Sequence, residues 1–429
     1  MDSSSRTDAR LRLVRSFSNN PIFSKVGIHE MSRFERLDRS VRMADEVVNV
    51  FLESGVEMKY IDLIIDILGE PLPTMMHYSM FLRSIDKLGS PSQKEAWFSR
   101  HDMIGAYAQT ELGWGSDVSN IETMAWKEPK GRHWILHSPS TASIKVWPGG
   151  LGSRASHALV VAKSEAGLRM YVVSLNSEGV TRGTMGHLLG FQNADNGWLK
   201  MDHVKVPLEN ALPIRPKREL YSTMVHTRGR IIRSSFFSLA KALTIAHGYA
   251  RVRTQPKGVP IIEHDHILHT LKSWTLFAEA LGRFSERSSD DIALKAFVTD
   301  ETLKGIEACR RICGGHGYAY YSGFPELITN YMATVTYEGS NEMLYARSME
   351  RSRNSLKQTK VLLKKRIMGK RRVRNPVSPL RSLRSLRSRI DAFKISPYEH
   401  NSILVAKNEE KLYEQIWDYL RGNTTQAKL

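Results

Sequence analysis

The chain has 429 residues, of which 41% are apolar, so it can bury a substantial core and form two or three domains. No uninterrupted run of about eighteen apolar residues occurs, and the N-terminus lacks the apolar segment of a secretory signal. The sequence therefore predicts no membrane-spanning helix. The formal net charge is +18, but ten Arg and five Lys against no Asp or Glu lie between residues 351 and 390, so the remainder is near neutral. The two cysteines, Cys309 and Cys313, lack a second Cys/His pair, and we expect reduced thiols and no metal site.

The first hundred residues predict helices. Val41–Leu52 and Tyr60–Leu68 carry apolar residues at three- and four-residue spacing. Two prolines end the second helix, and Ser90-Pro91 begins a short third one that runs to Trp97. We therefore expect an N-terminal helical domain over residues 1–100.

Residues 101–214 predict strands instead. Three short runs rich in β-branched and aromatic residues are separated by Gly, Pro and Ser: 132–137, 157–163 and 168–174. Asp195-Asn196-Gly197 is a hairpin-turn signal, and Trp198–Val206 after it alternates apolar and polar residues as one strand would. The prediction is a small antiparallel β-domain.

Residues 215–352 return to a helical pattern. Long helices are expected over Met224–His247, Ile262–Phe284 and Asp291–Arg311, followed by a last one over 341–351. The predicted fold class is therefore α+β, with an N-terminal helical domain, a central antiparallel β-domain and a C-terminal helical bundle. Residues 353–429 contain a low-complexity Arg/Ser/Leu stretch, which predicts a basic, partly disordered remnant with an amphipathic segment near residues 408–420.

The most informative segment runs from Cys309 to Tyr345. It places the turn Gly314-Gly315-His316-Gly317 ahead of a single carboxylate, Glu338, in the tetrapeptide Tyr-Glu-Gly-Ser. Glycines let backbone N–H groups approach a phosphate with no Cβ in the way. A lone Glu beside a glycine, between an apolar run and a helix, is a candidate desolvated general base. Together these features predict a nucleotide cofactor and proton abstraction next to it.

This segment resembles the acyl-CoA oxidase branch of the acyl-CoA dehydrogenase/oxidase flavoenzymes. Two further blocks carry the same resemblance, Tyr107-Ala-Gln-Thr-Glu-Leu-Gly-Trp-Gly-Ser-Asp117 and Ile144-Lys-Val-Trp-Pro-Gly-Gly-Leu-Gly152. The last three residues, Ala427, Lys428 and Leu429, resemble a Ser-Lys-Leu type peroxisomal address. Such oxidases carry a second large helical domain after the catalytic motif, so that domain is expected to be truncated here.

The resemblance implies a peroxisomal enzyme that contains FAD and oxidises fatty acyl-CoA to trans-2-enoyl-CoA, with O₂ reduced to hydrogen peroxide. Its implied partners are the acyl-CoA substrate, the peroxisomal import receptor, and a second copy or a related oxidase as dimer partner. By resemblance, Glu338 takes the proton from the substrate α-carbon, whereas His316 has a structural role. Arg253 is expected to reach the flavin diphosphate across a dimer interface. The full set of expected cofactor-binding residues is Thr110, Ser116, Gly149, Arg253, Gly314, Gly315 and Ser340.

Three other interpretations are open at this point. The chain could be an acyl-CoA dehydrogenase that passes electrons to another protein. It could be a catalytically impaired paralogue that partners a full-length oxidase, as the shortened C-terminal region suggests. Binding of nucleic acid or an anionic membrane through Arg351–Arg389 is disfavoured, because no aromatic residue is interleaved with the cations and no nucleic-acid fold signature occurs.

Overall fold

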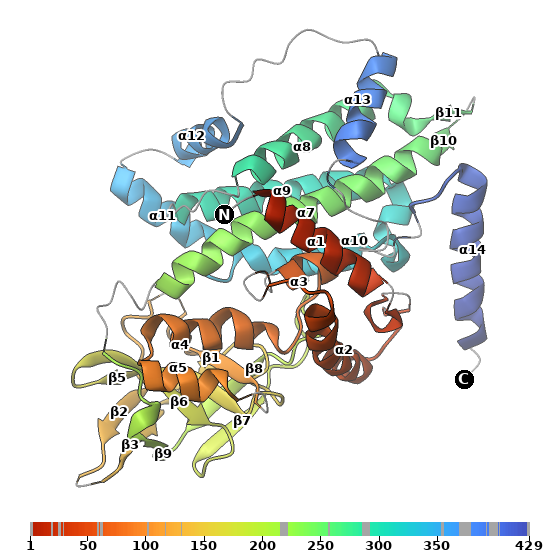
Figure 1. Ribbon diagram of the computed structural model, residues 1–429. Coiled ribbons are helices and arrows are strands. Elements are labelled where there is room, and N and C mark those ends of the chain that lie inside the picture. Colours follow the sequence, from red (N-terminus) through yellow and green to blue (C-terminus); the bar gives the residue numbers. More distant parts are fainter. Residues whose placement is uncertain are drawn as a thin grey trace. The chain divides into compact units, whose positions relative to one another are not determined.

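The computed structural model describes residues 3–426 apart from 19, 25–26, 29, 58–59, 61–62, 101–102, 116, 130, 215–221, 256–257, 285–291, 353–355, 369–378, 392, 394–401 and 403. The chain divides into two compact units. The first, the helical unit, comprises Met1–Glu30, Asp66–Gly69 and Arg228–Leu429, and the second, the sheet unit, comprises Met31–Ile65 and Glu70–Thr227. Figure 1 labels most of the helices and strands of both.

Helices of the sheet unit begin at well-defined caps. In α2 (Arg33–Glu53), the Ser32 hydroxyl accepts from the N–H of Glu35, whose carboxylate accepts from the N–H of Ser32. The same reciprocal pair starts α5 (Pro91–Phe98) at Ser90, with a proline in the first turn. The unit also contains α4 (Leu82–Leu88), preceded by one π-helical turn at His77–Phe81.

The strands of the sheet unit form two sheets. The larger has the order β1-β5-β2-β3-β9, with β6 paired to β5. Its strands are β1 (Gly105–Ala108), β2 (Met124–Lys127), β3 (His133–His137), β5 (His157–Ser164), β6 (Gly167–Ser174) and β9 (Val204–Pro207). The smaller sheet has the order β4-β8-β7, formed by Lys145–Val146, Gly197–Met201 and Val180–Thr184. Most pairings are antiparallel, but β1 and β2 both run parallel to β5, which the strand pattern did not predict.

Strand β5 shows how the alternation of a strand builds two cores. Val160 and its neighbours two residues away face a cluster that includes residues of the smaller sheet. Leu159 and Val161 point to the opposite face, where they pack with Ile85 and Leu88 of α4. The larger sheet is therefore buried on both faces at its centre, which explains why residues 158–162 of β5 are all apolar.

Two details of the predicted β-domain are wrong. Asp195-Asn196-Gly197 is not a tight hairpin turn: it ends the long loop 185–196 that joins the antiparallel strands β7 and β8, Gly197 is already the first residue of β8, and the Asp195 side chain binds another loop. The alternating run that follows is two strands: β8 joins the smaller sheet, and after a turn at Asp202 and His203, β9 joins the larger one.

The helical unit is organised around long helices that match the predicted ones. It contains α1 (Ser3–Ser18), α8 (Asp265–Phe284), α9 (Ile292–Ile312), α10 (Phe324–Met332), α11 (Asn341–Ser352) and most of α7 (Ser222–Val252). Residues of α7, α8, α9 and α11 share one apolar core. Together with the sheet unit this confirms the predicted α+β class. Among the described residues, no helix combines the length and apolarity needed to cross a membrane.

The basic C-terminal segment contains helices that the sequence pattern did not predict. Its described residues form α12 (Leu356–Met368) and α13 (Pro379–Asp391), followed by α14 (Glu409–Gln426) near the expected amphipathic segment. Leu363 of α12 and Leu386 of α13 are buried in the core of the helical unit, where both helices contact α8. The Leu-Arg-Ser repeat places apolar residues about one helical turn apart, so what resembles low complexity is an amphipathic helix.

Candidate functional site

Glu338 occupies a strained turn between a short 3-10 helix (Ala333–Val335) and α11. Its φ is 56°, in the left-handed region that a non-glycine residue rarely adopts, and the φ of Gly339 is 100°. A Cβ on Gly339 would lie 2.9 Å from the side chain of Leu344, so the second position requires glycine. Strain of this kind costs about 1–3 kcal/mol and is retained mainly at functional sites.

Two cationic side chains hydrogen-bond to the backbone of the Glu338 turn. Arg228 of α7 donates from Nε to the carbonyl of Glu338 at 2.8 Å. Lys295 of α9 is fully buried and donates from Nζ to the carbonyl of Gly339 at 2.8 Å and to Oδ1 of Asn341 at 3.1 Å. Residues of α7, α9 and α11 therefore meet at this turn. The two cationic side chains bind its backbone carbonyls.

The same environment sets the protonation of Glu338. Burial raises the pKa of the Glu338 carboxyl to about 7, and the positive charges of Arg228 and Lys295 oppose that rise. Burial lowers the pKa of Lys295 to about 8, with Arg228 adding to the effect. A carboxylate with a pKa near neutrality is a stronger base than one in water and can both accept and release a proton.

The Gly314-Gly315-His316-Gly317 turn lies in a 3-10 helix at the end of α9. An added Cβ on Gly314 or Gly315 would meet no atom within 4 Å, so the backbone there is open to a close ligand. Nδ1 of His316 lies 2.6 Å from the hydroxyl of Tyr321, consistent with the expected structural role.

Arg253 lies just after α7, in the same unit as the glycine turn. Its guanidinium hydrogen-bonds to Glu409 at 3.2 Å and to the hydroxyl of Tyr413, both from α14. The residue predicted to hold a diphosphate is therefore paired with a carboxylate of the chain itself.

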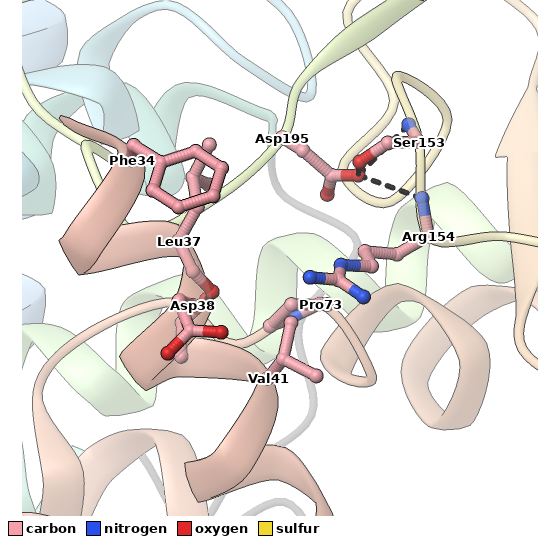
Figure 2. A pocket seen from close by; sticks show the side chains of 9 residues that line it. Phe34, Leu37, Asp38, Val41, Pro73, Ser153, Arg154 and Asp195 are labelled. Carbon is pink, nitrogen blue, oxygen red and sulfur yellow. Dashed lines mark hydrogen bonds between the residues drawn. The ribbon is translucent and has the colours of Figure 1, made fainter.

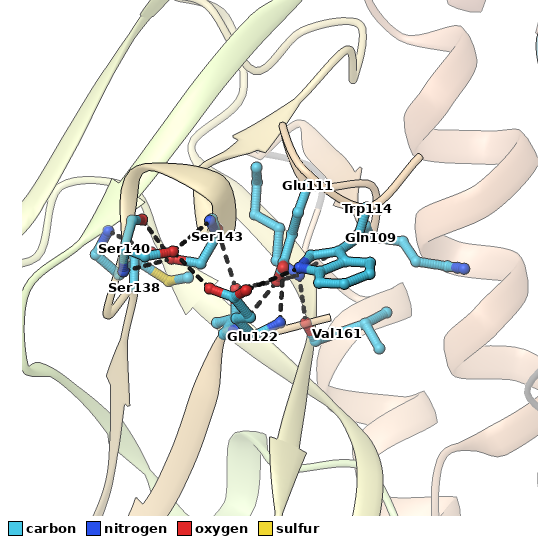
Figure 3. A network of polar contacts seen from close by, with 11 residues as sticks. Gln109, Glu111, Trp114, Glu122, Ser138, Ser140, Ser143 and Val161 are labelled. Atoms are coloured by element: carbon cyan, nitrogen blue, oxygen red, sulfur yellow. Dashed lines mark hydrogen bonds and ion pairs between the residues drawn. The ribbon is translucent and has the colours of Figure 1, made fainter. Parts of the chain in front are cut away.

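In the sheet unit, Thr110 lies between Gln109 and Glu111, which belong to a buried polar network (Figure 3 shows these two residues). Its carbonyl accepts from the N–H of Val146 at 3.0 Å. Next to it, the fully buried side chains of Glu111 and Lys145 are 2.9 Å apart. Lys145 also donates to the carbonyls of Gln109 at 3.0 Å and of Val161 at 2.7 Å. The residues on both sides of Thr110 are thus fixed by one network.

Gly149 lies in a loop that Asp195 organises (Figure 2). The Asp195 carboxylate accepts from the N–H groups of Gly150, Ser153 and Arg154 at 2.9–3.0 Å, and from the Ser153 hydroxyl at 2.9 Å. Preceding this loop, Trp147 is 52% exposed and has a φ of 87°. An added Cβ on Gly149 would meet nothing within 4 Å, which leaves its backbone accessible.

A cavity of about 180 Å³ adjoins the same loop within the sheet unit (Figure 2). Residues of α2 form one wall and the loop ordered by Asp195 forms the other. The lining residues are Phe34, Leu37, Asp38, Ser40, Val41, Pro73, Ser153, Arg154 and Asp195. None of the predicted cofactor residues lines it, and we assign it no ligand.

The predicted site residues are distributed over both units. Thr110 and Gly149 belong to the sheet unit, whereas Arg253, the glycine turn, Glu338 and Ser340 belong to the helical unit. Ser340 links Glu338 to α11, where its carbonyl accepts from the N–H of Leu344 at 3.0 Å. Ser116 and the terminal tripeptide 427–429 lie outside the described residues.

Sequence analysis did not identify the residues that support the loops and turns of the predicted site residues. These are Arg228, Lys295, Asp195 and the pair Glu111–Lys145. For Lys295 a signal existed, because it is a lone cation in the apolar run Ala293–Val298. Asp195 was instead assigned to a hairpin turn. The other residues carry no comparable signal, since their partners are distant in sequence.

One described cluster could bind a metal ion, although the sequence predicted none. Candidate ligand atoms of His137, Asp202 and His203 all lie within 4.8 Å of one another. Asp202 is already 2.7 Å from Nδ1 of His203 and 3.3 Å from Nδ1 of His137. The three side chains therefore contact one another directly, and we assign the cluster no ion.

Comparison with known proteins supports the family resemblance that the sequence motifs indicated. The family model "Acyl-coenzyme A oxidase N-terminal" matches residues 1–104, and "Acyl-CoA oxidase, C-alpha1 domain" matches residues 221–280 and 275–351. The chain is 29% identical over 394 residues to peroxisomal acyl-coenzyme A oxidase 1 of Arabidopsis thaliana, covering 78% of this chain and 59% of that protein. It is 31% identical over 406 residues to the Bos taurus protein of the same name, covering 80% and 61%.

Solved structures give the same result. Acyl-CoA oxidase 1 of Arabidopsis thaliana aligns with a TM-score of 0.73 at 26% identity, over 96% of this chain and 74% of that one. The tomato acyl-CoA oxidase LeACX1 aligns with a TM-score of 0.74, also at 26% identity, over 96% and 74%. A Caenorhabditis elegans acyl-CoA oxidase-2 bound with FAD, ascaroside-CoA and ATP has a TM-score of 0.78 at 20% identity, covering 96% and 90%, and shows the shared fold.

The match is partial in length, because the chain spans about 60% of the curated relatives that it matches. Within that span, two family models, the similar sequences and the solved structures all indicate the same group of proteins. The chain belongs to the acyl-CoA oxidase family.

Proposed function

We propose that the chain is an FAD-dependent acyl-CoA oxidase, which converts a fatty acyl-CoA to the trans-2-enoyl-CoA while O₂ becomes hydrogen peroxide. The observation that carries this proposal is the environment of Glu338. A half-buried carboxylate with a pKa of about 7, held in a strained turn by Arg228 and Lys295, has the properties of a general base.

Glu338 is the proposed acceptor of the proton from the substrate α-carbon. The C–H electron pair then forms the new double bond as the β-carbon loses its hydrogen with both electrons. The α-proton becomes acidic enough only if the thioester carbonyl is polarised, and the N–H of Glu338 is the proposed donor to that oxygen. Removing one such donor typically costs about 3–4 kcal/mol in the transition state.

The residues present fit a flavin dinucleotide. Gly149, Gly314 and Gly315 leave backbone accessible where an added Cβ would meet no other group, and Arg253 supplies paired donors for a diphosphate. We assign Thr110, Gly149 and Ser116 to the ring side of the cofactor, and Arg253, Gly314, Gly315 and Ser340 to its other contacts. FAD, when bound, supplies the hydride acceptor and the route for electrons to O₂.

The proposed partners follow from the same assignment. Arg253 is expected to serve the cofactor across a dimer interface, so we propose a homodimer or a dimer with a related oxidase. The relatives named above are peroxisomal proteins, and with the terminal Ala-Lys-Leu this supports a peroxisomal location through the import receptor.

A visible absorption spectrum tests the function directly. Purified protein loaded with FAD is mixed anaerobically with a long-chain acyl-CoA, and air is then admitted. We expect the flavin band to bleach and then return as hydrogen peroxide forms. Bleaching that air reverses only slowly would indicate a dehydrogenase. A protein that stays colourless after FAD is supplied would refute the proposal.

One observation bears on a second candidate, an impaired paralogue that partners a full-length oxidase. Arg253, the proposed ligand of the cofactor diphosphate, is paired with Glu409 of the chain itself. Flavin that binds only after the protein is mixed with a longer oxidase would support this candidate. Autonomous flavin binding with turnover would exclude it.

A further inference from the structure

Arg253 and Thr254 form a cradle of hydrogen-bond donors at the end of α7. Nη1 of Arg253 donates to Oε1 of Glu409 at 3.2 Å, and the N–H of Thr254 donates to the same oxygen at 3.1 Å. The Thr254 hydroxyl donates to the second carboxylate oxygen, and the Tyr413 hydroxyl donates to Oε1 at 2.7 Å. The guanidinium of Arg253 and the backbone amide and hydroxyl of Thr254 therefore converge on one anion, and Tyr413 of α14 itself adds a fourth hydrogen bond.

The anion in the cradle is firmly ionised. The hydrogen bond from the Thr254 hydroxyl, followed by those from Tyr413 and the Thr254 backbone, lowers the pKa of Glu409 to about 2. These same donor types bind phosphate oxygens in proteins. The cradle is thus built for an anion, and a glutamate of α14 serves as its present occupant.

Apolar contacts of the segment before α14 and of α14 itself bring Glu409 to this place. Leu404, Leu412 and Ile416 are buried in the core of the helical unit, and Val405 packs against Gly248 of α7. Other large side chains of α14 remain at the surface, since Tyr413 is 42% exposed and Trp417 is 58% exposed. A helix held by few buried side chains and one ionic contact can detach at a modest cost in free energy.

We propose that the Arg253–Thr254 cradle binds the diphosphate group of a nucleotide, and that Glu409 is a built-in competitor which must leave before the ligand binds. The inference rests on the function proposed above, in which Arg253 serves a diphosphate. Glycine backbone open to a ligand lies in the same unit. The ring of His316 in that turn lies 6.0 Å from the ring of Tyr249, whose carbonyl accepts from the N–H of Arg253 at 2.9 Å, so the turn and the cradle are close together. Detachment of α14 therefore controls whether the cradle is available.

Two ligands of this chemistry are relevant, because FAD and coenzyme A both contain the diphosphate of ADP. Only molecules in which α14 is detached can bind either ligand. The apparent Kd is therefore the intrinsic Kd divided by the fraction of such molecules. The test therefore uses ADP as the shared probe, with FAD and free CoA as arms that separate the two sources.

The experiment compares ADP binding by calorimetry in four proteins at constant ionic strength: wild type, Glu409→Gln, Glu414→Gln and Arg253→Gln. Glu414 is the matched control, since it lies on α14 but pairs with Lys411 instead of the cradle. We expect Glu409→Gln to bind ADP about tenfold more tightly, Glu414→Gln to match wild type, and Arg253→Gln to lose binding. Amide hydrogen exchange of residues 409–418 in the wild-type protein should accelerate when ADP is bound.

Several results would overturn the proposal. One is equal ADP affinity in wild type and Glu409→Gln when both unfold at the same temperature. Another is Arg253-dependent ADP binding that leaves exchange in α14 unchanged, a readout that requires no variant. Tighter ADP binding by Glu409→Gln without FAD binding or acyl-CoA-dependent bleaching would support the cradle while refuting the oxidase function. Acyl-CoA-dependent bleaching, together with an ADP affinity that Glu409→Gln does not change, would support the oxidase function while refuting the role of Glu409 in the cradle.

Discussion

The chemistry proposed for this chain depends on one carboxylate that the fold makes expensive to ionise. Glu338 sits in a left-handed turn, and burial alone would push its pKa well above the ordinary value for a glutamate. Arg228 and Lys295 keep the ionised form accessible near neutral pH, and they also bind the carbonyls of the turn. Position and basicity are therefore set by the same two side chains.

The pH dependence of flavin reduction should follow this arrangement. Proton abstraction needs the ionised form of Glu338, so the rate of anaerobic bleaching should rise with pH through a midpoint near 7. Glu338→Gln should retain the flavin band and lose bleaching at every pH. Glu342→Gln, an exposed position on α11, should behave as wild type. A Glu338→Gln protein that still bleaches would remove Glu338 as the base.

Stability should show the opposite trend with pH. Because the pKa of Glu338 is raised in the folded state, its contribution is favourable below the unfolded pKa of about 4.5 and is lost as pH rises through 7. Relative to Glu338→Gln, the wild-type protein should therefore lose free energy of unfolding between pH 5 and pH 8, by up to about 2 kcal/mol. Urea unfolding of both proteins at the two pH values measures this; a constant difference between them would contradict it.

Lys295 tests the role of the supporting cations. Lys295→Met removes a positive charge near Glu338 and leaves the carbonyl of Gly339 without this donor, which should cost about 1–3 kcal/mol. The midpoint of the pH profile for bleaching should move to higher pH, because the ionised base has lost a stabilising charge. Lys304→Met on the same helix, 60% exposed, is the control and should change neither property. An unshifted midpoint would mean that Lys295 acts on the turn alone.

At the scale of elements, the sheet unit orders its two candidate cofactor loops by buried polar networks. Asp195 supports the loop of Gly149 through four hydrogen bonds, and Asp195→Ala should lower the free energy of unfolding by about 3 kcal/mol. FAD affinity should fall with it, since the loop loses its anchor. Asp202→Ala, at a side chain that is 70% exposed, should leave both unchanged. Denaturant titration and a flavin-binding assay on the same samples would separate the two effects.

Helix α12 gives a paired test of whether the basic segment is part of the core. Leu363 is 5% exposed and faces the core of the helical unit, whereas the adjacent Leu362 is 54% exposed. Leu363→Asp buries an unpaired charge and should cost about 3 kcal/mol or more, but Leu362→Asp should be nearly neutral. Equal effects from the two substitutions would show that α12 does not pack as described.

At the scale of the molecule, periodicity in the sequence was enough to predict the α+β class and the main helices and strands. It could not predict which segments share a core: Met1–Glu30 groups with Arg228–Leu429, far away in sequence. The site showed the same division. Local motifs indicated Glu338 and the glycine turn, but Arg228 and Asp195 gain their roles only through distant partners. The amphipathic pattern of α13 was not recognised, because its repeated arginines drew attention away from the helical spacing of the buried residues Leu386 and Ile390.

The net charge of +18 should produce weak, salt-sensitive attraction to polyanions without a specific complex. Part of the charge is committed within the helical unit, since Arg389 pairs with Glu279 at 3.1 Å and Lys360 lies 3.9 Å from Asp300. The sequence between Arg351 and Arg389 contains no aromatic residue, so no aromatic platform accompanies these cations. We therefore expect RNA or anionic vesicles to bind at about 20 mM salt and to be released at about 150 mM, because counterion release dominates such binding. Retention at physiological salt would instead establish the basic helices as a binding surface, and substitution of the exposed Lys364 and Lys365 on α12 would then locate it.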